Sequence, residues 1–180
     1  MERLLKLKHW QIFSLIIIAP IFLIIFGGVI SKVTGIRFLG TFFASIAALT
    51  IIISYFGWIW TTGNLLFRHG IKIKIINFKV FNFCFILSLV LFFGLIPYLK
   101  TVLSTENMYL INILTIIYIL FFFYCIFFIA KSLNFIENQN SMKTNPLFLD
   151  FLLIWILPIG IWLIQQRLKR ILLNDKKDAQ

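Results

Sequence analysis

The acidic side chains are the first candidates for chemistry, because a charge within or beside an apolar run is costly to bury. The chain has only six Asp and Glu residues. Glu106, Glu137 and Asp150 border long apolar runs, and only the run beside Asp150 also contains helix breakers, Pro158 and Gly160. Asp150 is therefore the candidate functional acid. The alternative is a structural acid that complements the dipole in the first turn of a helix.

No set of nucleophile, base and metal ligands accompanies this acid. His9 and His69 are too far apart in the sequence for a metal-binding pair such as H-x-x-x-H. Cys84 and Cys125 lie inside apolar runs, as core-packing thiols do. The chain also lacks a nucleophile elbow and a glycine-rich phosphate loop. We therefore expect no enzymatic activity and no cofactor or metal. An intramembrane enzyme using Asp150 is the least favoured alternative.

Small residues recur three and four positions apart in the second apolar run. Such spacing lets two helix backbones approach closely within a membrane, where packing holds helices together. The face can serve internal packing against the first or third run, which we favour, or a homo-oligomer interface. This candidate helix-packing face comprises Gly40, Ala44, Ala47, Ala48, Ser54 and Gly57.

The elements that carry these residues are apolar runs of membrane-spanning length. The chain has 180 residues, of which 61% are hydrophobic and 13% charged, and its mean hydropathy is +1.00. A soluble domain is about half apolar and a quarter charged. We predict an all-α, polytopic transmembrane helix bundle, a single domain over residues 1–170 followed by a charged tail at 171–180. The predicted spans are 10–30, 38–60, 81–99 and 108–130, and a fifth apolar segment covers 147–164.

The fifth segment is re-entrant, interfacial or a short span. About 18 residues of helix reach roughly 27 Å, slightly less than a 30 Å hydrocarbon core. Five full spans would divide the 17 Lys and Arg residues nine to eight across the membrane. Four spans, with the fifth segment returning to its starting side, would divide them fourteen to three. The positive-inside rule therefore favours four spans with both termini in the cytoplasm. An arrangement with five full spans is the alternative.

The net charge of +11 is concentrated beside the apolar runs. This distribution is typical of orientation in the membrane and of contact with anionic lipid headgroups, whereas nucleic acid is not an expected partner. The predicted basic cytoplasmic face comprises Arg68, Lys72, Lys74, Lys79, Arg167, Lys169 and Arg170.

Several motifs occur in a recognisable order. They are KLKHWQ at 6–11, FGWIW at 56–60, FYC at 123–125, AKSL at 130–133 and LIWILPIGIW at 153–162. The chain resembles an uncharacterised family of small multi-span inner-membrane proteins of Bacteroidota, and it departs from that pattern at Gln166, where Pro is expected. The resemblance implies location and architecture, without an activity. By size and composition the chain also resembles the membrane accessory proteins of type VI-B CRISPR systems.

These observations predict a non-enzymatic accessory or scaffold protein of the bacterial inner membrane, multi-pass, with a cytoplasmic N-terminus. It would act through helix packing and its basic face, with copies of itself or another membrane protein as partner. The alternative is an oligomeric pore or permeability effector in a bacterial defence system, assembled through the small-residue face.

Overall fold

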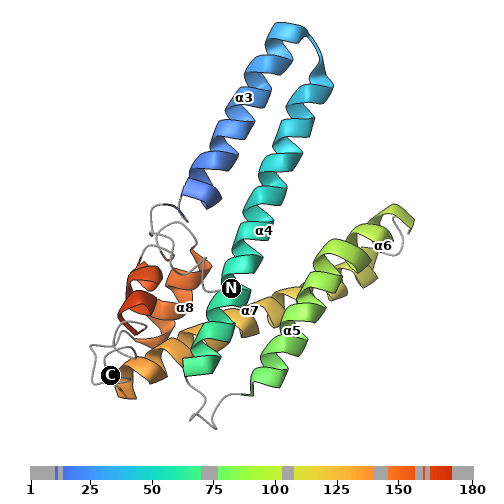
Figure 1. The fold of residues 1–180 in the computed structure, drawn as a ribbon. Coiled ribbons are helices and arrows are strands. Elements are labelled where there is room, and N and C mark those ends of the chain that lie inside the picture. The colour runs from blue at the N-terminus through green and yellow to red at the C-terminus, as the bar shows by residue number, and fades with distance from the viewer. Residues whose placement is uncertain are drawn as a thin grey trace. The chain divides into compact units, whose positions relative to one another are not determined.

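The computed structural model describes residues 11, 14–69, 77–102, 108–139, 146–156, 160 and 163–171 (Figure 1). These residues are almost entirely helical, and no strand occurs among them. The expected all-helical class is confirmed for this part of the chain. Its contacts form two compact units, Met1–Thr62 with Phe148–Gln180, and Gly63–Leu147. Four stretches are long and apolar enough to cross a membrane: Ile16–Thr34, Arg37–Arg68, Phe78–Val102 and Tyr109–Asn138.

The first unit contains a hairpin of two long helices. A π-helical turn, η1 (Ser14–Ile18), leads into α3 (Ala19–Thr34), and α4 (Arg37–His69) follows after two residues. Gly35 ends α3 with φ at 71°, a left-handed conformation that glycine adopts without a steric penalty. The short link predicted between the first two spans is therefore a glycine-capped turn.

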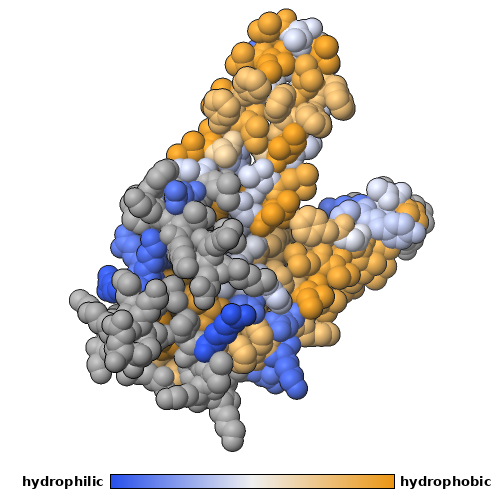
Figure 2. Space-filling model, in the orientation of Figure 1, coloured by the Kyte–Doolittle hydropathy of each residue, from blue (hydrophilic) through white to orange (hydrophobic). Residues whose placement is uncertain are grey.

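Small residues bring α3 and α4 together. A Cβ atom at Gly27 would overlap the side chain of Phe43, and one at Gly40 would lie 3.2 Å from Ser31 Cβ. Phe26 also meets Phe43 edge to face, with ring centroids 5.4 Å apart. The face of this hairpin that is visible in Figure 2 is mostly apolar. Most large side chains of α3 are exposed, as expected for a helix that contacts lipid.

The second unit is built around α5 (Phe78–Val90) and α7 (Met108–Gln139). Phe81 of α5 stacks on Phe128 of α7 with centroids 4.5 Å apart, and Phe92 lies 5.4 Å from Tyr118. Positions rise along α5 as they fall along α7, so the two helices are antiparallel.

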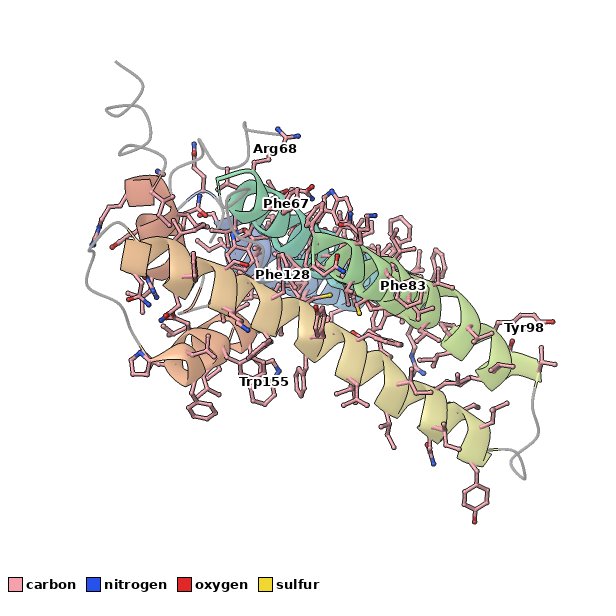
Figure 3. All side chains as sticks on the ribbon, turned by 90° about the horizontal axis from the view of Figure 1, so that it is seen from below. Phe67, Arg68, Phe83, Tyr98, Phe128 and Trp155 are labelled. Carbon is pink, nitrogen blue, oxygen red and sulfur yellow. The ribbon has the colours of Figure 1, made fainter. Side chains whose placement is uncertain are left out.

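The end of α4 joins this unit through the stack of Phe67 on Phe78, with centroids 4.0 Å apart. Phe67, Phe83 and Phe128 mark the aromatic packing in Figure 3. A Cβ at Gly63 would overlap the ring of Phe81, so glycine is needed there for close approach. Aromatic packing thus holds the three helical segments of the unit together.

Helices extend beyond the predicted spans in three places. The second was expected to end at residue 60, whereas α4 continues to His69, because Thr62, Gly63 and Leu66 are buried there. This packing overrides the weak helix propensity of threonine and glycine. α7 ends at Gln139, nine residues beyond its predicted bound. α5 continues through η2 (Leu91–Leu95) and α6 (Ile96–Val102).

The π-helical turns each precede a proline. η1 lies before Pro20 and η2 before Pro97. Proline lacks a backbone N–H and crowds the carbonyl one turn earlier, and a widened turn accommodates that change. The helix therefore continues past Pro97 and beyond residue 99, where the predicted span ends.

Candidate functional site

The fifth apolar segment contains only a short helix. α8 covers Leu147–Trp155, and residues 163–171 are helical again. Nine residues of helix extend about 14 Å, half the thickness of a typical hydrocarbon core. α8 therefore cannot cross a membrane by itself.

Asp150 and Arg167 form a two-point ion pair between these helical segments. Arg167 Nη1 donates to Asp150 Oδ1, and Nη2 donates to Oδ2 at 3.0 Å. Asp150 is fully buried and Arg167 is 9% exposed. In a continuous helix, residues 17 positions apart would lie about 26 Å from each other. The contact therefore requires the chain to fold back between α8 and residues 163–171. We call this arrangement the C-terminal hairpin.

Gly160 supplies a second contact that requires the same reversal. A Cβ atom at this position would overlap the backbone carbonyl of Leu153. A backbone atom cannot move aside as the end of a flexible side chain can. Glycine is therefore the residue that permits this close approach.

The hairpin packs on α4 within the first unit. The Tyr55 hydroxyl donates to the carbonyl oxygen of Ile154 at 3.2 Å. Trp58 Nε1 donates to Oε1 of Gln165 at a distance of 3.5 Å, which makes a long and weak hydrogen bond. Tyr55 and Trp58 are buried, so their polar atoms use these contacts in place of water. Ile154, Ile164, Leu168 and Ile171 of the hairpin are almost completely buried.

The outward face of α8 is apolar. Phe148 is 70% exposed and Trp155 is 50% exposed, and Leu149 and Ile156 are exposed beside them. Figure 3 shows Trp155 on the outer side of α8. The charge pair thus lies inside the hairpin and hydrophobic side chains lie outside, the reverse of a water-soluble helical hairpin. Such a surface suits contact with lipid.

The small-residue face of α4 is divided between buried and exposed positions. Gly40 packs against Ser31 of α3, and Ala47 is fully buried. Ala44 and Ala48 are exposed. Ser54 and Gly57 are half-buried, and a Cβ atom at Gly57 would meet nothing within 4 Å. Part of the face therefore serves internal packing, and part is available for another contact.

The predicted basic face also divides. Arg68 and Lys79 are exposed at the adjoining ends of α4 and α5. Arg170 is exposed and Lys169 half-buried, whereas Arg167 lies in the ion pair and not at the surface. Lys72 and Lys74 lie outside the described residues, as do residues 1–10 and 172–180.

Sequence reasoning identified Asp150 but not its partner. The spacing of 17 residues between Asp150 and Arg167 has no helical periodicity that could reveal a contact. Trp58 lies near the end of the predicted span 38–60, and it is buried against Gln165. The packing on α4 therefore had no clear signal in the sequence.

Two further buried polar atoms lack a hydrogen-bond partner among the described residues: Thr62 Oγ1 on α4 and Asn82 Oδ1 on α5. In the same part of the chain, no three His, Cys, Asp or Glu side chains are grouped as they would be to hold a metal ion.

Comparison with protein-family models, with curated proteins and with solved structures finds no match to this chain.

Proposed function

We propose that this protein is a non-enzymatic accessory or scaffold protein of the bacterial inner membrane. In this proposal four helices span the bilayer, and the C-terminal hairpin is re-entrant, so that both termini lie in the cytoplasm. The protein would hold a membrane-protein partner, or copies of itself, through exposed helix faces. Its basic residues would contact anionic headgroups on the cytoplasmic side.

The ion pair is the observation that carries the proposal. Asp150 is the acid that the sequence marks for chemistry, and both of its carboxylate oxygens accept hydrogen bonds from Arg167. A carboxylate engaged in this way by a guanidinium is strongly stabilised in its charged form and its position. The geometry supports a structural role for Asp150, which holds a membrane-embedded hairpin together.

The distribution of charge supports the orientation. On α5 and α7 the register places Lys79 level with Lys131, at the end of the unit that also carries Arg68. The opposite end of α5–α6 carries Lys100. An excess of Lys and Arg marks the cytoplasmic side of short connections. The basic end is therefore the cytoplasmic one in this proposal.

A photo-crosslinking experiment tests the scaffold function. A photoreactive amino acid at Ala44 or Ala48, both exposed on α4, should crosslink to one defined protein in intact cells. The same probe at Ile25, which is 62% exposed on the outer surface of α3, serves as the control. A discrete adduct from α4 that is absent from α3 supports the proposal. Lipid adducts alone from both helices contradict it.

The mass of the adduct separates the possible partners. The chain has a mass of 21.2 kDa. An adduct of twice that mass indicates a second copy, and an adduct of any other mass indicates a different membrane protein. If the adduct is a second copy, purified oligomer in liposomes should show whether it conducts ions. Flux that depends on the oligomer would replace the scaffold proposal with the pore alternative.

A further inference from the structure

The segment from 147 to 171 has a second possible arrangement in the membrane. Extended as a single helix, its 25 residues would be about 38 Å long, more than the 30 Å hydrocarbon core. The same residues can therefore form a re-entrant hairpin or a fifth span. In the hairpin the tail returns to its starting side, and in the span it reaches the opposite side.

Charge distinguishes these two arrangements. In the hairpin Asp150 and Arg167 neutralise each other inside the protein. In a straight helix they would be about 26 Å apart, near opposite membrane surfaces, where each could reach water. In the straight helix, therefore, neither charge would be buried in hydrocarbon. Removing one partner, in contrast, takes both hydrogen bonds of the pair away from the other charge while it stays buried in the hairpin, which is strongly unfavourable.

Apolar packing alone does not strongly favour the hairpin. The exposed apolar residues of α8, Phe148, Leu149 and Trp155, and Ile156 just after it would contact lipid in either arrangement. Among the described residues, the hairpin contains the ion pair, the hydrogen bonds from α4 to Ile154 and Gln165, and the fully buried Ile164 and Leu168. Among these the ion pair is the one with two charged hydrogen bonds.

We propose that the Asp150–Arg167 pair is a topological lock that keeps the C-terminal tail on the cytoplasmic side. The inference rests on the proposed re-entrant hairpin and adds the interaction that selects it. With the pair intact, the hairpin is favoured. With either partner removed, a fraction of the chains inserts the segment as a fifth span and exposes the tail on the other side.

The test uses the full chain with a C-terminal reporter. Green fluorescent protein reports a cytoplasmic tail, and alkaline phosphatase reports a periplasmic one. For wild type we expect fluorescence with little phosphatase activity. For Asp150→Asn and Arg167→Gln we expect at least a tenfold rise in the ratio of phosphatase activity to fluorescence. The charge-reversed double variant, Asp150→Arg with Arg167→Asp, should lower that ratio towards the wild-type value.

Lys169→Gln is the matched control. It removes one positive charge from the same helix but leaves the pair intact, and its ratio should equal that of wild type. An equal rise in Lys169→Gln and Arg167→Gln would assign the effect to the charge count of the tail and overturn the lock. Unchanged ratios in both Asp150→Asn and Arg167→Gln would also overturn it.

Arg167→Lys provides a second test of the lock if Asp150→Asn or Arg167→Gln does not accumulate in the membrane. It keeps the charge and loses the two-point geometry, so its ratio should lie between those of wild type and Arg167→Gln, and above wild type in any case. A ratio equal to wild type would overturn the lock. A wild-type tail in the periplasm would instead refute the re-entrant hairpin of the proposed function, so the two failures are distinguishable.

Discussion

Phe81 of α5 stacks on Phe128 of α7, and this contact sets the register of the two antiparallel helices. Three residues beyond Phe81 along α5 lies Cys84, and three residues before Phe128 along α7 lies Cys125. Both thiols are free and buried. The register therefore places them at the same level of the helix pair, although they are 41 positions apart in the sequence.

This register predicts that Cys84 and Cys125 can be crosslinked. Treatment of membranes with copper phenanthroline should form an intramolecular disulfide, detected as a loss of 2 Da and of maleimide labelling after denaturation. The matched control is Phe83→Cys combined with Cys84→Ser, because Phe83 is 62% exposed and meets α7 at Phe121, one helical turn away from Cys125. Equal crosslinking in the control, or none in wild type, would contradict the register.

Replacing Gly63 with alanine should destabilise the second unit. The added Cβ overlaps the ring of Phe81, which is itself fully buried. Overpacking of this kind typically costs about 1–3 kcal/mol. The measurement is unfolding in a mixed-detergent titration. Gly57→Ala is the control, because a Cβ there meets nothing within 4 Å, and the helix should be slightly stabilised. Equal effects at the two positions would refute the close contact.

A double-mutant cycle should show strong coupling between Asp150 and Arg167. Replacing either partner alone with alanine removes both hydrogen bonds of the pair from the buried charge that remains, and we expect a loss of roughly 3–5 kcal/mol in the free energy of unfolding. The double replacement Asp150→Leu with Arg167→Met should lose much less, because an apolar pair of similar size carries no desolvation penalty. Additive losses in the two single variants and the double alanine variant would exclude the ion pair.

Thr62→Val should be neutral or stabilising. The Thr62 hydroxyl is fully buried and has no hydrogen-bond partner among the described residues, so replacing it with a methyl group removes an uncompensated polar atom. The neighbouring Thr61→Val is the comparison, because its hydroxyl donates to the carbonyl of Gly57 at 2.6 Å. We expect Thr62→Val to be the more stable of the two by up to about 1 kcal/mol. The opposite order in the same unfolding titration would show that Thr62 has a partner.

Much of the fold follows from local sequence properties. Apolar runs long enough to cross a bilayer must satisfy their backbone hydrogen bonds internally, so the four long helices could be predicted from hydropathy alone. The short link between the predicted spans 10–30 and 38–60 corresponds to the turn at Gly35 that joins α3 and α4. The ends of α4 and α7 could not be predicted, because tertiary packing extends them through polar residues such as Thr62 and Ser132.

The C-terminal hairpin separates what the sequence determined from what the tertiary structure decided. The sequence by itself showed that the segment after Asn145 was apolar, interrupted and flanked by an acid, and its charge balance favoured a return to the starting side. Only the tertiary structure paired Asp150 with Arg167 and placed Gly160 on Leu153. Hydropathy and charge counts depend on local composition, whereas an ion pair across 17 residues depends on the path of the chain between them.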